Sequence, residues 1–149
     1  MKDEKSILDE EHEELIGMLV EVAGKHTEVG RLFSEVLRIF RYHLDKENET
    51  VLPLLSYLKE RLGNHNGNNK EALKLAWIEF KNDYPEMMHE HQEMGKLLER
   101  ASNFMRINSD KAAMDLAEHL LNHVDFEEEI LYPAAFASGK LIELEMKIS

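Results

Sequence analysis

Two short units of this chain pair a histidine with a glutamate four residues later. His43 and Glu47 form the first unit, and His123 and Glu127 form the second, in a matching stretch of the other half of the chain. Side chains four residues apart lie on one face of a helix, about 6 Å apart along its axis, so both can reach one ion. The repetition therefore predicts a metal site that draws on both halves of the chain.

A further histidine stands upstream of each unit in an acidic setting, His12 in the first half and His91 in the second. Four imidazoles and two carboxylates, without sulfur, suit iron, manganese or zinc better than calcium or magnesium. Two glutamates from opposite helices could bridge two ions about 3.5–4 Å apart. Each ion would then keep open coordination positions for a small ligand such as dioxygen, nitric oxide or peroxide.

A structural role for the same six residues is the alternative. A buried imidazole or carboxylate is costly unless it is paired, hydrogen-bonded or bound to metal. Core histidines with hydrogen-bond partners, and glutamates in ion pairs between helices, would also meet that requirement. Chance rarely duplicates both the residue types and their spacing, so the repeat favours the metal site.

Composition excludes several classes of site and partner. The chain has no cysteine, which rules out disulfides, thiolate zinc sites, iron–sulfur clusters and cysteine nucleophiles. Thirty acidic against eighteen basic residues give a net charge of −12, which repels nucleic acid and anionic lipid surfaces. No apolar stretch approaches the roughly 18 residues of a membrane span, and the N-terminus has no apolar signal segment. We therefore expect a cytoplasmic protein with neither nucleic acid nor membrane as a partner.

The elements that must position these residues are helices. Three prolines, seven glycines and many helix-forming residues favour an all-α fold, and 149 residues fit one domain. Apolar stripes predict a helix over residues 6–24, with Ser6 at its start and His12 at the centre of its inward stripe. A second helix is expected over residues 27–62, with a kink at Pro53, followed by a loop.

The second half repeats this plan. A helical region over residues 71–105 contains Pro85, and Asp83 is expected to cap the bundle helix proper. After a turn at residues 108–110, the fourth helix is expected to present Ala113, Leu116, Leu120, His123, Glu127, Ile130 and Ala134 on one side. A short helix over residues 139–148 is expected to follow Pro133. The duplicated hairpins, about 6–62 and 83–137, predict an antiparallel up-down-up-down four-helix bundle.

One segment, residues 70–83, has no counterpart in the first half. It carries Leu73, Ala76, Trp77 and Phe80 at helical spacing, and an apolar face of this kind needs a cover. We expect it to pack across an end of the bundle or against another subunit of a homo-oligomer.

With all six positions in order, the chain resembles the hemerythrin-like, or HHE cation-binding, domains over nearly its whole length except residues 70–83. The resemblance implies two iron ions, joined by an oxo or hydroxo group, in a non-haem centre; manganese or zinc would fit the same donors. Family members carry oxygen, sense oxygen or redox state, bind iron, or act on nitric oxide and peroxide. The metal ligands that the resemblance implies are the bridging Glu47 and Glu127 and the terminal His12, His43, His91 and His123.

Two departures from the oxygen carriers of this family bear on function. Those proteins have a further histidine four residues before the third-helix ligand, where this chain has Met87, and their fourth-helix motif ends with an aspartate at i+5 instead of Glu127 at i+4. Both argue against reversible oxygen carriage. Either the thioether of Met87 or the imidazole of His119 could replace the missing ligand, although methionine more often fills gaps in a core.

Other polar residues near the motifs are less specific. His26 and His65 are expected in connections, and His89 on the surface. The sequence leaves open whether Tyr42, Tyr84 and Tyr132 line the pocket or hydrogen-bond to it. Helical phase places Asp45, Asp125, Glu49 and Glu129 away from the core.

Three functions follow from these patterns. The first is a di-iron protein that binds or senses dioxygen, nitric oxide or peroxide, or handles iron. The second is an enzyme that turns over peroxide or nitric oxide at the same centre. The third is a metal-free all-α interaction module in which the histidines and glutamates are structural. The sequence favours a binding protein over a dedicated enzyme.

Overall fold

The computed structural model describes residues 4–63 and 69–147, with side chains described from Leu8 onward. All the regular structure in these ranges is helical, as the sequence predicted. The elements are α1 (Glu4–Ala23), α2 (Glu28–Glu49), α3 (Val51–Leu62), α4 (Lys70–Ile107), α5 (Lys111–Phe126), the π-helix η1 (Glu127–Leu131) and α6 (Tyr132–Met146).

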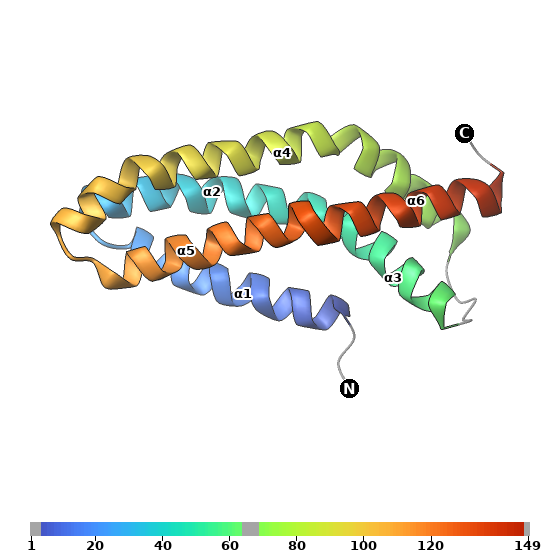
Figure 1. Ribbon diagram of the computed structural model, residues 1–149, viewed down its shortest axis with the longest axis horizontal. Helices are drawn as coiled ribbons and strands as arrows, with labels where there is room; N and C mark the ends of the chain where they lie inside the picture. The colour runs from blue at the N-terminus through green and yellow to red at the C-terminus, as the bar shows by residue number, and fades with distance from the viewer. Residues whose placement is uncertain (1–3, 64–68, 148–149) are drawn as a thin grey trace.

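The helices form a bundle of long rods (Figure 1). α1, α2, α4 and α5 lie alongside one another, and α5, η1 and α6 follow each other as one nearly straight rod. α3 departs from the line of α2 and packs near α6 at the end of the bundle that carries the C-terminus. Four rods around one interior can therefore each contribute side chains to one place.

Local sequence signals set several of the helix ends. Thr27 caps α2, as its position predicted, because its hydroxyl accepts a hydrogen bond from the Gly30 N–H at 3.0 Å. Asp110 caps α5 through the Ala113 N–H at 3.2 Å, after Ser109 makes the turn with a φ of 51°. α1 begins at Glu4, two residues before the expected start at Ser6.

The break between α2 and α3 lies at Thr50, not at the expected Pro53. Proline has no N–H to donate to the carbonyl four residues earlier, and its ring crowds that carbonyl. For Pro53 this carbonyl belongs to Glu49, the last residue of α2, so the disruption falls upstream of the proline itself. The Thr50 hydroxyl donates to the Lys46 carbonyl at 2.7 Å and satisfies part of the helix end.

α4 is continuous through Pro85, so the expected cap at Asp83 is wrong. Residues 70–83 are the first turns of α4 instead of a separate helix, and the helix bends at this end (Figure 1). A proline inside a helix costs one hydrogen bond and bends the rod without ending it when tertiary contacts hold both sides. The apolar residues of this segment supply those contacts.

Trp77 and Phe80 are buried within the chain at the end of the bundle. Phe136 of α6 meets both rings, with centroids 5.8 Å from Trp77 and 4.8 Å from Phe80. The chain therefore covers this face itself, which is one of the two covers the sequence predicted. Assembly into a homo-oligomer through this segment stays a prediction.

The expected short helix at residues 139–148 begins earlier, because α6 starts at Tyr132 and includes Pro133. Proline is tolerated in the first turn of a helix, where its missing N–H matters least. The expected loop at residues 63–69 lies largely outside the described residues. Among those described, no helix is both long enough and apolar enough to cross a membrane.

Two apolar clusters divide the interior of the bundle. One lies among α1, α2, α4 and α5 and includes Leu15, Phe40 and Met94, while the other joins α3, α6 and the ends of α1 and α4 and includes Leu8, Leu54 and Trp77. Along α1, Leu8 belongs to the second cluster and Leu15 to the first, and His12 lies between them. A polar layer therefore crosses the bundle between two apolar regions.

Candidate metal centre

All six residues that the sequence selected are buried in this polar layer. His12 comes from α1, His43 and Glu47 from α2, His91 from α4, His123 from α5 and Glu127 from the first position of η1. They form two groups of four whose donor atoms lie within 4.8 Å of one another, and both groups contain Glu47 and Glu127. The structure thus brings together a site with two halves and two shared carboxylates.

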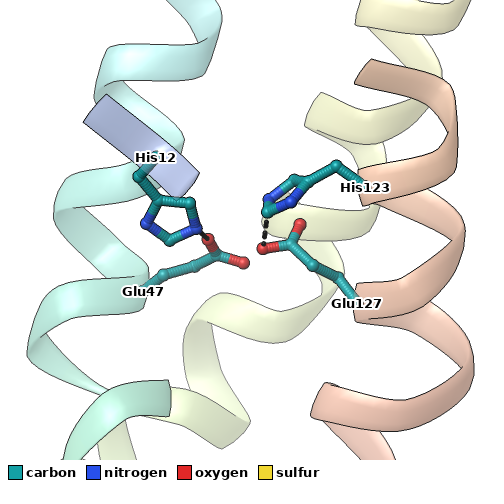
Figure 2. A group of neighbouring side chains, drawn as sticks. All are labelled: His12, Glu47, His123 and Glu127. Carbon is teal, nitrogen blue, oxygen red and sulfur yellow. Dashed lines mark ion pairs between the residues drawn. The ribbon is translucent and has the colours of Figure 1, made fainter. Parts of the chain in front are cut away.

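The first group consists of His12, His123 and the two shared glutamates, whose side chains point toward one another from α1, from α2 and from the rod of α5 and η1 (Figure 2). His12 Nε2 lies 3.8 Å from Glu47 Oε1, and His123 Nε2 lies 3.3 Å from Glu127 Oε2. Within the described part of the chain, none of these four buried atoms has a hydrogen-bond partner. Orphaned buried polar atoms are rare and costly, and one cation bound among the four would satisfy them all.

The second group consists of His43, His91 and the other oxygens of the same glutamates. His91 Nε2 lies 3.0 Å from Glu127 Oε1, and His43 Nε2 lies 3.2 Å from Glu47 Oε2. The two imidazoles are 3.1 Å apart through their Nε2 atoms. Two nitrogen donors and two carboxylate oxygens at this spacing fit a first-row transition metal.

Carboxylates outside the two groups orient three of the histidines. Glu90 Oε1 accepts from His43 Nδ1 at 2.9 Å, and Glu128 Oε2 accepts from His91 Nδ1 at 2.8 Å. His123 Nδ1 is held in the same way by Glu11, at 2.7 Å. An ionised carboxylate can only accept, so Nδ1 of each ring carries a hydrogen, and Nε2 is the nitrogen that faces the site interior and is available to an ion. Such carboxylate–histidine pairs are the usual support of metal-ligating histidines.

Two of these three supports cross between the two halves of the chain. Glu11 immediately precedes His12 and Glu90 immediately precedes His91, so the two glutamates occupy equivalent positions in the repeat. Each contacts the His-x-x-x-Glu histidine of the opposite half, His123 or His43. In both halves, the histidine of the His-x-x-x-Glu unit is therefore oriented by a carboxylate of the opposite half, whereas Glu128 supports His91 within its own half.

Without a cation, some of the six residues in the polar layer hold protons. Burial raises the pKa of Glu47, and the neighbouring Glu127 carboxylate contributes, bringing it to about 8. Burial lowers the pKa of His123, but its hydrogen bond and charge interaction with Glu127 outweigh this and raise it to about 9. Burial, together with the His123 charge, lowers the pKa of His12 to about 4. A metal ion must therefore displace protons from Glu47 and His123 at neutral pH.

Comparison with known protein families places the chain in one of them. The family described as the hemerythrin HHE cation binding domain matches residues 3–135. The chain belongs to this family. No curated protein and no solved structure gives a significant match.

One turn of the hemerythrin domain departs from the helical phase that the sequence predicted. Ile130 was expected to point inward but is 54% exposed, while Tyr132 is 1% exposed. In a regular α-helix a residue five positions after Glu127 would lie about 140° around the axis from it. Here the N–H of Tyr132 bonds to the Glu127 carbonyl, five residues back, and this wider π turn brings Tyr132 inward.

Tyr132 is the site residue that sequence reasoning left undecided. Its hydroxyl donates to Glu47 Oε2 at 2.7 Å, whereas Tyr42 is 57% exposed. Tyr84 contacts the Tyr132 ring edge-on, with centroids 5.9 Å apart. The sequence offers one signal for it. Tyr132 stands at a position of the repeat where the two halves differ, since the equivalent residue of the first half is Leu52.

The remaining candidates of the hemerythrin domain differ in their surroundings. Met87 is fully buried in the second apolar cluster, where a gap-filling role accounts for it. His119 is not among the residues of the two donor groups. His26 and His89 are exposed, as expected, and His65 lies outside the described residues.

Proposed function

We propose that this chain is an up-down-up-down four-helix bundle whose two donor groups hold two iron ions, and that this centre binds or senses dioxygen, nitric oxide or peroxide. The observation that carries the proposal is that Glu47 and Glu127 belong to both groups, each with one oxygen toward each histidine pair. Two shared carboxylates favour two neighbouring ions over a single one.

The residues present fit such a centre. His12, His123 and one oxygen of each glutamate would hold one ion, and His43, His91 and the remaining oxygens would hold the other. The bound ions would supply open coordination positions and a reversible change of oxidation state. The two apolar clusters exclude water from both sides of the polar layer, which strengthens the electrostatic attraction between the donors and the ions.

His12 provides the approach to this layer from the surface. It lines a cleft of ≈ 380 Å³ together with Arg41 and Asn48, whereas the His43 side chain is completely buried. A diatomic molecule or peroxide is small enough to enter past His12, which favours small ligands over larger substrates.

Metal analysis tests the proposal directly. Protein purified without chelator and loaded with ferrous iron should hold about two irons per chain, with an ultraviolet–visible spectrum that changes on dithionite reduction. Glu47→Ala and Glu127→Ala should each lose both ions, because each glutamate serves both groups. Glu49→Ala and Glu129→Ala are matched controls, since these exposed glutamates lie two residues further along each repeat. Retention of both irons in Glu127→Ala would contradict the proposal.

An enzyme acting on peroxide or nitric oxide is the second candidate. Met87 in place of the fifth histidine leaves a coordination position that a reactive ligand could use. Multiple-turnover assays with the iron-loaded protein separate the two functions, because a binding protein reacts stoichiometrically and then stops, whereas an enzyme continues.

A further inference from the structure

The two halves of the site differ most at one position of the repeat. Leu52 and Tyr132 each stand five residues after the shared glutamate of their own half, Glu47 or Glu127. The first half therefore offers a hydrocarbon side chain where the second half offers a phenol. The hydroxyl of that phenol lies on the side of His43 and His91, so the difference falls on one of the two donor groups.

The Tyr132 oxygen contacts all four donor atoms of this group. It lies 2.7 Å from Glu47 Oε2, 3.1 Å from His43 Nε2, 3.3 Å from His91 Nε2 and 3.5 Å from Glu127 Oε1. The ring stacks on that of His91, with centroids 5.6 Å apart and planes 10° from parallel, which fixes its direction. The hydroxyl is therefore placed among the donors by packing.

These distances match those between neighbouring ligands of one metal ion. With metal–nitrogen and metal–oxygen bonds of about 2.0–2.2 Å, ligand atoms at right angles to each other lie about 3 Å apart. The four distances from the Tyr132 oxygen range from 2.7 to 3.5 Å. An ion placed among His43, His91 and the two glutamates would thus find the phenol oxygen at the distance of a fifth ligand.

Counting hydrogens supports the same assignment. The Nδ1 atoms of His43 and His91 each donate a hydrogen to Glu90 or Glu128, so Nε2 is the nitrogen that each ring turns toward the Tyr132 oxygen. Tyr132 has one hydrogen to share among these two nitrogens and two carboxylate oxygens. A cation placed among these five nitrogen and oxygen atoms would be attracted to all of them in a buried space where such attraction is strong.

We infer that Tyr132 is a fifth protein ligand of the metal held by His43 and His91, and that the two metals therefore have unequal surroundings. The inference rests on the proposed function. As a ligand, Tyr132 would bind as the phenolate, and its hydroxyl hydrogen would leave to solvent as a proton. The phenolate adds a negative charge to this metal alone and favours its ferric state over its ferrous state, because hard anionic oxygen donors stabilise the higher charge.

Spectroscopy of the diferric protein tests this. Wild type should show a visible phenolate-to-iron charge-transfer band, and resonance Raman excitation into it should enhance tyrosine ring vibrations. Tyr132→Phe should lose both while keeping its helical content, because phenylalanine preserves the packing. Tyr84→Phe is the matched control: its ring contacts that of Tyr132, and it should keep the band. The loss in Tyr132→Phe should be complete, whereas the control should match wild type.

Three outcomes separate this inference from the proposed function. Wild-type protein with two irons and no enhanced tyrosine vibrations overturns the inference and leaves the di-iron proposal standing. Enhanced tyrosine vibrations that persist in Tyr132→Phe also overturn it, because another tyrosine would then be the ligand. Wild-type protein that binds no iron overturns the proposed function, and the inference fails with it.

Discussion

Glu90 links a buried imidazole to a buried ammonium group. Its Oε1 accepts from His43 at 2.9 Å, and its Oε2 accepts from the Lys46 ammonium at 2.7 Å. Together these bonds lower the pKa of the Glu90 carboxyl, despite its burial, so the group remains an acceptor for His43. The orientation of one metal-facing histidine therefore depends on a residue that itself contacts no ion.

Replacing this carboxylate should weaken metal binding without removing a ligand. Glu90→Gln leaves a single acceptor oxygen for two donors, His43 Nδ1 and the Lys46 ammonium, so the support of His43 is weakened. We expect about a 10–100-fold loss of metal affinity, the usual effect of removing such a support. Glu86→Gln is the control, because Glu86 also pairs with Lys46, at 2.9 Å, but its side chain is more exposed. Competition with a chelator of known affinity measures both, and equal affinities would contradict the expectation.

The protons held by the cluster should make metal binding depend on pH. Glu47, with a pKa of about 8, and His123, with a pKa of about 9, are both protonated at pH 7 in the metal-free protein. Because the raised pKa values favour the protonated forms, metal affinity should rise from pH 6 toward pH 9 and fall in acid. Calorimetric titration in buffers of different ionisation enthalpy measures the released protons. Binding without proton release would show these pKa values to be wrong.

At the scale of single residues, the repeat was enough to select the six residues that meet in the polar layer. Charged and imidazole side chains on apolar stripes are few, and helical spacing states which of them share a face. The role of Tyr132 could not be read in the same way, because a regular helix places it away from Glu127. Its position depends on a π turn, for which sequence carries no comparable signal.

α6 approaches α4 so closely that only glycine fits at one contact. A Cβ atom on Gly139 would lie 2.1 Å from Cε3 of the Trp77 ring, well inside van der Waals contact. The indole therefore occupies space that the absent side chain leaves free. This contact fixes α6 against the segment that has no counterpart in the first half of the chain.

The two residues should prove coupled in stability measurements. Gly139→Ala should cost about 1–3 kcal/mol through overpacking, and Trp77→Ala about 3–5 kcal/mol through the cavity it leaves. The double variant should cost less than the sum, because removing the indole makes room for the methyl group. Denaturant unfolding measures the free energy of unfolding of all three variants. Gly17→Ala is the control: no atom lies within 4 Å of its new Cβ, so it should not destabilise the protein. Additive losses would contradict the contact.

At the scale of elements, the helices followed from the sequence, but their behaviour at proline did not. The break after α2 lies at Thr50, three residues before Pro53, Pro85 bends α4 without ending it, and Pro133 lies in the first turn of α6, after a π turn. Proline disrupts the helix at Pro53 and Pro85, whereas it is tolerated in a first turn such as that of Pro133. The form of the disruption depends on tertiary contacts that the sequence does not reveal, such as those of Trp77 and Phe80 around the first turns of α4.

For the whole molecule, a polar layer between two apolar clusters links stability to the metal. Among the described residues, the donor group of His12 and His123 buries four atoms without hydrogen-bond partners. These groups cost free energy that a bound ion would recover. The fold is therefore expected to be more stable with metal than without it.

Thermal unfolding tests this expectation. Ferrous iron at 100 times its dissociation constant should stabilise the folded protein by about 2.7 kcal/mol and raise Tm. Glu47→Ala, which removes a carboxylate shared by both groups, should show no such rise. A wild-type protein that melts identically with and without iron would support the metal-free interaction module instead.

The crossed carboxylates Glu11 and Glu90 mean that a single hairpin of this design is incomplete, since each half aligns the imidazole of the other. Two identical hairpins paired about a two-fold axis would complete each other, as self-complementary surfaces do in symmetric dimers. When the two hairpins belong to one chain, they no longer need to have the same sequence. One copy can then keep Leu52 while the other acquires Tyr132, so that a pair of equivalent binding positions becomes a pair of specialised ones.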